Sequence, residues 1–442
     1  MKKVLMLSYY FPPLGMGGTQ RAAKFARYLP EFGWEPTVLT VKPISYWAED
    51  SSLLEEMAAT RIVRTGSLDP QRLLHLLTRR AGKETGAAAG REGAGTSGGT
   101  AAGQEKAVTF GGAAAWLNRK LLPWFLLPDS KILWRWHATR AAARLLRSGE
   151  FSAIWSTSPP HSTHLIARRL AHRFRLPWVA DFRDEWAGGV VVHEPTPWHR
   201  RRQQALQVKV ARAAAALIGV TPGIVAGLEA AGGSGRCHLI TNGFDAADLA
   251  TIGEAAMNRE EAHFTLCHCG SISRFSNPAP LLEALIPGDA RWLRLRFIGY
   301  DANGGFEEQV RRRGLEEMIS WRGYLPHREA LVSMAAADAL LLIACDAPKA
   351  RFIPGKTFEY LASRKPILAI SNVEETIRLL EEMPGVILCA PDQPAAIRTA
   401  LLRLQSEPEL LRAAAERNVQ HYDRRDQAGE LARILDRITE ER

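Results

Sequence analysis

Short apolar runs alternate with amphipathic segments along most of this 442-residue chain. The first run, residues 4–8, is apolar up to its last residue, Ser8, as is typical of a strand buried in a parallel sheet. A helix is expected next, from Thr19 to about Phe32. Strand–helix alternation of this kind is typical of doubly wound α/β folds. Further strands of this first set are expected at residues 34–41, 60–65, 153–156, 178–180 and 216–220.

A second set of alternating elements begins at residue 263. Its strands are expected at residues 263–270, 295–299, 319–323, 339–343, 366–370 and 385–388. Because the chain is too long for one ordinary core, two domains are the default expectation. The pattern therefore predicts an α/β protein with two tandem Rossmann-like domains facing a cleft. The boundaries that we expect are an N-terminal domain at 1–245, a C-terminal domain at 246–420, and a C-terminal helix at 421–442.

Two segments interrupt the first set of elements. Residues 82–112 are rich in Gly and Ala and have almost nothing to bury, so we expect a flexible insert there. Residues 116–136 interleave apolar, aromatic and basic side chains. Such a stretch suits a membrane interface. The alternative, a crossover packed on the sheet with its tryptophans in the core, is favoured by the acidic Asp129 and the Ala-rich helix that follows.

The composition is that of a soluble globular protein, with 46% hydrophobic and 24% charged residues. No apolar run approaches the length of a membrane span, and the N-terminus is too quickly polar for a signal peptide. The cytoplasm, including the inner face of the membrane, is therefore the expected location. The five cysteines fit that compartment and lack metal-ligand spacing, so no structural metal is expected.

The net charge of +10 requires an explanation. No zinc finger, RNA-recognition motif or basic-aromatic platform is present, which argues against a nucleic-acid partner. Two interpretations remain: an arginine-rich surface with no specific partner, or attraction to anionic phospholipid as a peripheral membrane protein.

The segment 351–370 indicates function more strongly than any other. It reads as a Gly-bearing loop, a short helix opening near Lys356 and Thr357, and a Pro-started strand. Unpaired N–H groups at a helix start, with a lysine beside them, suit a phosphate. Glu359, one turn into the helix, can accept hydrogen bonds from two sugar hydroxyls. Together these features predict a site for a nucleoside diphosphate and its ribose.

The same segment resembles the donor-site signature of the GT-B glycosyltransferases, and of family 4 in particular. Glu359, Ala362 and Pro366 stand where that signature requires them, but Arg351 stands where the family has an acidic residue. The resemblance implies a retaining transferase that uses a nucleotide-sugar donor and needs no metal. The departure at Arg351 puts the usual contact with the donor sugar in doubt: either the donor carries a carboxylate, or the loop is shifted and another residue substitutes.

Two further loops are expected to reach the donor diphosphate. Gly17 and Gly18 follow the first strand, where adjacent glycines let backbone amides approach an anion. In the family a Gly-Gly loop here closes over the diphosphate, so this role carries over by resemblance. Ser271 and Arg274 follow the first strand of the second domain, and the resemblance gives Arg274 the role of a diphosphate ligand. The structural alternatives are that Gly17 and Gly18 only form a tight turn, and that Arg274 is an ordinary surface residue.

The acceptor side is expected to involve residues after two strands of the first domain. His161 can accept or relay a proton. Arg183 and Asp184 can position acceptor hydroxyls, with Asp184 acting as a base. The structural alternatives are a helix-capping histidine and an Arg–Asp pair that shapes the loop. The spacing of these acids is not that of a metal-binding Asp-x-Asp motif.

The function predicted from the sequence is transfer of a sugar from a nucleotide-sugar to a hydroxyl acceptor. Lys356, Arg274, His161 and Asp184 are the predicted catalytic residues. A role in surface polysaccharide or glycolipid synthesis is expected by resemblance, and the Trp-rich segment would suit a lipid-linked acceptor. The alternatives are a nucleotide-sugar epimerase of the same fold, and a non-catalytic scaffold that has lost its donor pocket.

Overall fold

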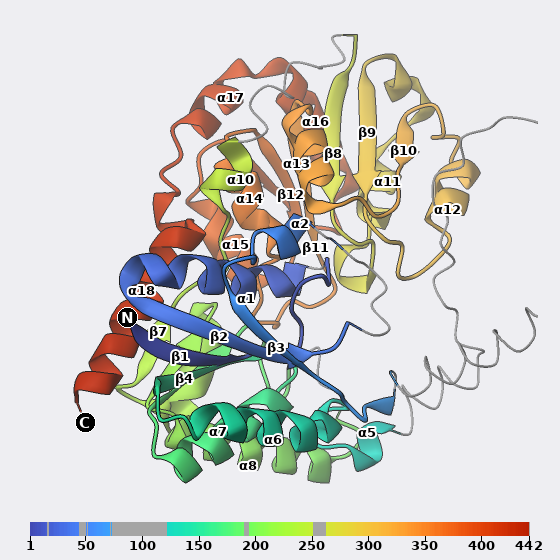
Figure 1. The fold of residues 1–442 in the computed structure, drawn as a ribbon. Coiled ribbons are helices and arrows are strands. Elements are labelled where there is room, and N and C mark those ends of the chain that lie inside the picture. Colours follow the sequence, from blue (N-terminus) through green and yellow to red (C-terminus); the bar gives the residue numbers. More distant parts are fainter. Residues whose placement is uncertain are drawn as a thin grey trace, which may run out of the picture.

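The computed structural model describes residues 1–15, 17–43, 50, 52–70, 72, 122–189, 194–250 and 262–441. In these residues the chain forms two parallel β-sheets, each covered by helices on both faces (Figure 1). The predicted α/β architecture of two Rossmann-like domains is therefore confirmed. The predicted insert at 82–112 and residues 251–261, just after the predicted domain boundary, lie outside the described residues.

The N-terminal sheet has seven strands in the order β3-β2-β1-β4-β5-β6-β7. Every pair that the structure records in it is parallel. The strands are β1 Lys2–Leu7, β2 Trp34–Val41, β3 Arg61–Thr65, β4 Phe151–Ser158, β5 Trp178–Phe182, β6 Ala216–Gly219 and β7 Cys237–Leu239. The short edge strand β7 was not expected, because its residues lack the apolar run that marks the others.

One face of this sheet is covered by helices from the two ends of the chain, and the other face by helices from its middle. One face packs against α1 (Gly17–Tyr28) and the C-terminal helix α18 (Arg424–Glu440) in a core that includes Phe25, Trp155 and Leu431. The other face packs against α6 (Arg135–Leu146), α7 (Ser162–Phe174) and α8 (Pro197–Ala213). The chain therefore ends on the N-terminal domain after building the C-terminal one (Figure 1).

The C-terminal sheet has six strands in the order β10-β9-β8-β11-β12-β13, all parallel. The strands are β8 Phe264–Cys269, β9 Leu293–Ile298, β10 Ile319–Trp321, β11 Ala339–Ala344, β12 Ile367–Ser371 and β13 Val386–Cys389. One face buries α11 (Ala279–Ala284), α12 (Phe306–Arg312) and α16 (Pro394–Ser406), and the other buries α13 (His327–Ala335), α14 (Lys356–Ala362) and α15 (Glu374–Glu381). The remaining described helices are α2 Ser52–Glu55, α5 Leu122–Phe125, α9 Pro222–Leu228, α10 Ala246–Ala250 and α17 Pro408–Ala415.

Candidate active site

Both sheets reverse their strand order at one point, and the predicted residues cluster at these two points. In the N-terminal sheet the reversal lies between β1 and β4, and in the C-terminal sheet between β8 and β11. Ligands of open α/β sheets bind beside the carboxyl ends of strands at such points. The loops that follow these four strands carry most of the predicted donor and acceptor residues.

The loops at the carboxyl ends of the two sheets meet each other. The Tyr324 hydroxyl, from the loop after β10, donates a hydrogen bond to the Gly15 carbonyl after β1, at 2.8 Å. The His327 backbone N–H donates to the Asp50 carboxylate, after β2, at 3.1 Å. The carboxyl ends of the two sheets therefore lie on the sides of the domains that face each other.

Lys356, the first residue of α14, is held by a neighbouring histidine. The buried His268 places its Nδ1 3.0 Å from the Leu341 carbonyl, which makes Nδ1 the protonated nitrogen. Nε2 is then free to accept a hydrogen bond from the Lys356 ammonium, 3.0 Å away. Sequence reasoning missed His268. Its signal was a lone polar residue between Cys267 and Cys269 at the carboxyl end of an apolar strand.

Gly270 leaves room for this lysine. A Cβ built on Gly270 would lie 2.7 Å from Lys356 Nζ, and the residue has a φ of +148°. Only glycine combines that backbone with the close approach of the ammonium group. The glycine that follows β8 therefore lets the start of the loop that carries Ser271 and Arg274 lie next to Lys356.

The lowered pKa of Lys356 suits a side chain that binds an anionic ligand. Burial lowers the pKa of Lys356 to about 7, against a weaker opposing effect from Cys269 and Cys267. The neutral His268 beside it supplies no charge, since burial and Lys356 hold its pKa well below the usual value. A bound diphosphate would restore the proton to Lys356 and complete the pair.

Glu359 lies one turn further along α14. Burial raises the pKa of its carboxyl, and His327 and Arg424 oppose that shift. His327 Nε2 lies 3.8 Å from the Glu359 carboxylate and 3.6 Å from that of Asp248. The side chain remains 25% exposed, so its carboxylate keeps access to a ligand hydroxyl.

The other predicted donor residues lie around this pair. Arg274 is exposed, with its guanidinium 4.4 Å above the ring of Phe275, and it forms no ion pair within the described part of the chain. Ser271 is exposed at the start of the same loop. Thr357 is buried beside Lys356, and its hydroxyl has no hydrogen-bond partner among the described residues. Their roles as donor ligands stay predictions.

Arg183 ties the Gly-Gly loop to the end of β4. Its guanidinium donates to the carbonyl of Gly18, to that of Ser158 at 3.0 Å and to that of Pro159 at 2.8 Å. Gly18 follows Gly17 in the first turn of α1. Because all these contacts are to backbone oxygens, Arg183 positions this loop, and its predicted contact with the acceptor stays a prediction.

His161 and Asp184 lie on the same side of the domain. His161 is buried and stacks on Trp186, with the ring planes 6° apart and the centroids 4.6 Å apart. Burial, His164 and Arg183 lower its pKa well below the usual value, and its Nδ1 has no partner among the described residues. Burial also raises the pKa of the half-buried Asp184, whereas Arg183 opposes that shift. A neutral imidazole and a basic carboxylate are consistent with the predicted proton-handling roles, which remain predictions.

Arg351 reaches across to the N-terminal domain. Its Nη1 donates to the Gly223 carbonyl at 2.9 Å and lies 3.4 Å from the Glu185 carboxylate. Its own carbonyl accepts a hydrogen bond from the Thr221 hydroxyl at 3.1 Å. The Gly223 N–H donates to Glu375 at 2.7 Å, so the same turn is held from two sides. At the position where the family has its acid, this chain therefore has a contact between domains.

We expect Arg351→Glu to lower sugar transfer about three- to tenfold, because the new carboxylate would face Glu185 and Glu375 across a half-exposed contact. The rate on a neutral sugar donor would not improve. Steady-state kinetics of Arg351→Glu, Glu185→Arg and the double variant provide the check. Recovery in the charge-swapped double variant supports the contact, whereas a gain in the single Arg351→Glu variant would show that the position serves the donor sugar.

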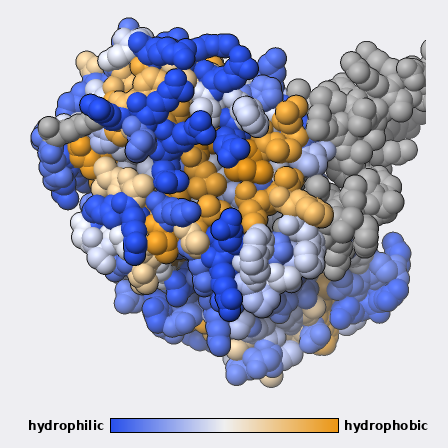
Figure 2. All heavy atoms as spheres, turned by 90° about the horizontal axis from the view of Figure 1, so that it is seen from below, coloured by the Kyte–Doolittle hydropathy of each residue, from blue (hydrophilic) through white to orange (hydrophobic). Residues whose placement is uncertain are grey.

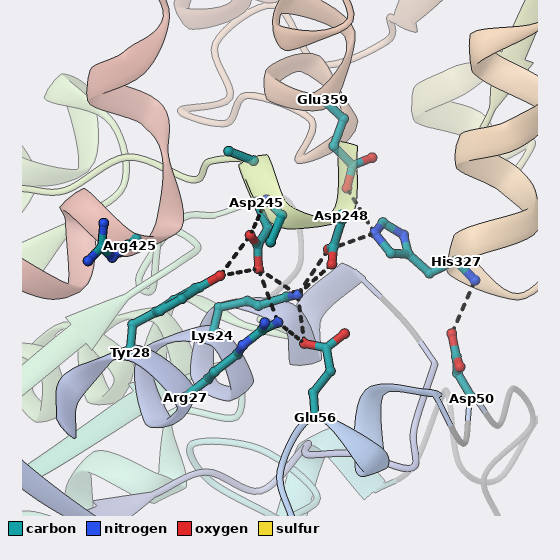
Figure 3. Close-up of polar contacts among 12 residues, drawn as sticks. Lys24, Arg27, Tyr28, Asp50, Glu56, Asp245, Asp248, His327, Glu359 and Arg425 are labelled. Carbon is teal, nitrogen blue, oxygen red and sulfur yellow. Dashed lines mark hydrogen bonds and ion pairs between the residues drawn. The ribbon is translucent and has the colours of Figure 1, made fainter. Parts of the chain in front are cut away.

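A buried lysine joins the two domains beside Glu359 (Figure 3). The Lys24 ammonium lies 2.7 Å from Glu56, 2.6 Å from Asp245 and 2.9 Å from Asp248. Burial opposes its charge, but Asp248 and Asp245 outweigh that effect and raise its pKa. Through Asp248 and His327 this network continues to Glu359. Sequence reasoning missed all of these partners, because they come from segments that are far apart in the chain.

The fold and these contacts define a glycosyltransferase of the GT-B type. Residues 16–243 match the model of the glycosyl transferase 4-like domain, and the chain belongs to that family. No curated protein sequence matches it.

Solved structures show the same fold at low sequence identity. Sucrose-phosphate synthase from Thermosynechococcus elongatus is 15% identical with a TM-score of 0.65, over 100% of both chains. HepE from Anabaena, in complex with UDP and glucose, is 16% identical with a TM-score of 0.61, over 99% of this chain and 100% of that one. A candidate UDP-N-acetylglucosamine 2-epimerase from Listeria monocytogenes is 12% identical with a TM-score of 0.59, over 100% and 98%. The fold is thus shared by proteins with different chemistries.

None of the helices in the described ranges has both the length and the apolar character that crossing a bilayer requires.

Proposed function

We propose that the protein transfers a sugar from a nucleotide-diphospho-sugar to a hydroxyl acceptor. The observation that carries this proposal is the pair on α14: Lys356, held beside Gly270 by a neutral histidine, and Glu359 one turn away. A lysine of lowered pKa and a carboxylate at this spacing suit a diphosphate and the ribose attached to it. The complex of HepE with UDP and glucose supports a nucleotide donor for this fold.

Charge that develops on the leaving diphosphate is the main obstacle to the reaction. Lys356 and Arg274 would stabilise it, assisted by the backbone amides of Gly17 and Gly18, and such preorganised electrostatics usually supply the largest catalytic contribution. These groups carry the charge without a metal ion. The family resemblance implies retention of the anomeric configuration, with the departing phosphate helping to deprotonate the acceptor.

On the acceptor side, His161 and Asp184 would contact the hydroxyl, with Arg183 holding the loop that separates them from the donor. The acceptor class that we propose is a growing surface polysaccharide or glycolipid at the inner face of the membrane, including lipid-linked acceptors. This part rests on the family resemblance.

Release of nucleoside diphosphate from a panel of UDP-, GDP- and ADP-sugars tests the proposal. Release that depends on an added hydroxyl acceptor and persists with a chelator supports a metal-independent transferase. The alternative function is that of a nucleotide-sugar epimerase, as the name of the similar Listeria structure suggests. An epimerase would convert the donor sugar without an acceptor. Conversion of that kind, or no turnover with any donor, would contradict the proposal.

The lowered pKa of Lys356 predicts a pH dependence of donor affinity. The protonated lysine binds the diphosphate, and its population in the free enzyme falls above a pKa of about 7. The dissociation constant for a nucleoside diphosphate is therefore expected to rise by up to about tenfold per pH unit above that value. Calorimetry between pH 6.5 and 9 measures it. In Lys356→Arg the dependence should disappear, because arginine stays charged; a dependence that survives would assign it to another group.

A further inference from the structure

The outer helical layer of the N-terminal domain carries no acidic residue. The three helices α6, α7 and α8, of 12, 13 and 17 residues, contain eleven Arg or Lys and no Asp or Glu. The whole chain has 47 acidic residues, so the absence is local to this layer. An arginine-rich composition alone would not remove the acids from one face. Figure 2 looks onto the molecule from this side and shows strongly hydrophilic side chains around hydrophobic ones.

A groove of about 1110 Å³ runs along this layer. Its basic lining residues are Arg135, Arg168, Arg169, His172, Arg175 and Lys209, and Glu441 is its one acidic lining residue in the described part of the chain. Leu165, Leu206 and Ile438 form apolar parts of the wall. A groove of this make-up fits phosphate groups attached to apolar chains.

Exposed aromatic side chains border the same layer. Trp124 and Phe125 of α5 are 47% and 80% exposed, Trp136 of α6 is 64% exposed and Trp198 of α8 is 55% exposed. His199 joins two of them, since its ring lies edge-on to those of Trp124 and Trp198. Tryptophan beside arginine is the combination that proteins place at the headgroup level of a bilayer.

The position of the aromatic residues favours a membrane over a nucleic acid. Trp136 and Trp198 are the second residues of their helices, so they lie at one end of the layer, outside the groove. Single-stranded nucleic acid needs aromatic platforms along its basic track. A protein that docks on a bilayer instead needs aromatic side chains at the edge of its surface that enters the headgroup region.

We propose that the α6–α8 layer, with the aromatic rim of Trp124, Phe125, Trp136 and Trp198, docks the protein on a bilayer containing anionic phospholipid. The surface goes beyond the proposed sugar transfer, because it uses none of the donor residues. Helices α7 and α8 begin near the carboxyl ends of the strands, so the rim lies on the side of His161 and Asp184. An acceptor held in the membrane could then reach the site directly.

Flotation with unilamellar vesicles tests the docking surface. The full-length protein is expected to bind vesicles of phosphatidylglycerol and phosphatidylcholine, and to bind pure phosphatidylcholine far more weakly. Arg168→Glu/Arg169→Glu should weaken partitioning into the anionic vesicles by at least about thirtyfold, and Trp124→Ala/Phe125→Ala by at least about tenfold. The matched control is Arg291→Glu/Arg412→Glu, which makes the same charge change at exposed positions of the C-terminal domain.

The control must bind as wild type, and the unfolding midpoint and nucleotide affinity of every variant should match those of wild type, which separates docking from folding and from the donor site. The proposal is overturned if the protein does not bind anionic vesicles, or if Arg168→Glu/Arg169→Glu and the control variant weaken binding equally. It is also overturned if the protein binds a single-stranded oligonucleotide more tightly than the vesicles at the same salt concentration.

Discussion

Replacing Lys356 by alanine is expected to lower kcat for sugar transfer by about 10²–10³-fold, the loss seen when one preorganised charge-stabilising group is removed. The ammonium group lies 3.0 Å from His268 Nε2, and burial, which removes part of its hydration, lowers its pKa to about 7. A diphosphate that gains charge in the transition state needs this lysine more than the ground-state donor does. Steady-state kinetics with the preferred donor provide the measurement.

Lys349→Ala is the matched control, because Lys349 is an exposed lysine seven residues earlier, in the loop that leads to α14. It should leave kcat within about twofold of wild type, as is usual for a surface substitution. A Lys356→Ala variant that keeps full turnover would remove the lysine from the mechanism. A variant with raised KM and unchanged kcat would make it a ground-state binding residue only.

Lys24→Met is expected to destabilise the protein by about 3–5 kcal/mol, the cost of breaking a buried ion pair from one side. The Lys24 side chain is fully buried, and its removal would leave Asp245, Asp248 and Glu56 facing one another without a cation. For a domain of this size the unfolding midpoint should fall by about 10 °C. Differential scanning calorimetry measures the change.

Two further variants test whether the loss of stability in Lys24→Met comes from the broken ion-pair network or from the loss of any lysine. The exposed Lys42 changed to Met should shift the midpoint little. Adding Asp248→Asn and Glu56→Gln to Lys24→Met should recover part of the stability, because the remaining carboxylate charge falls. If the triple variant is less stable than Lys24→Met alone, the carboxylates are not held together by the lysine charge.

The sequence predicted the strands and the places of the donor residues because both depend on local patterns. An apolar run as short as residues 339–343 is typical of a buried strand, since a buried helix is usually longer, and the Gly-bearing loop before Lys356 has a recognisable composition. Once the strands are known, parallel order places the loops after them at one edge.

Contacts between distant segments could not be predicted in this way. Nothing near Arg351 in the chain indicates that its guanidinium meets Gly223 and Glu185 of the other domain. Lys24 reads as one polar residue of an amphipathic helix, yet it is fully buried among carboxylates from two other segments. The acid-free layer also emerges only when α6, α7 and α8 are seen side by side (Figure 1).

Calorimetric titration of UDP, GDP and ADP into wild type, Lys356→Ala and Glu359→Ala tests the donor site most directly. We expect micromolar binding of one of the three nucleotides, weakened at least about tenfold in each variant because each variant removes a charge-assisted contact. Equal binding by all three proteins would place the nucleotide elsewhere. No binding by wild type at millimolar concentrations would contradict the donor site and favour a scaffold that has kept the fold without the chemistry.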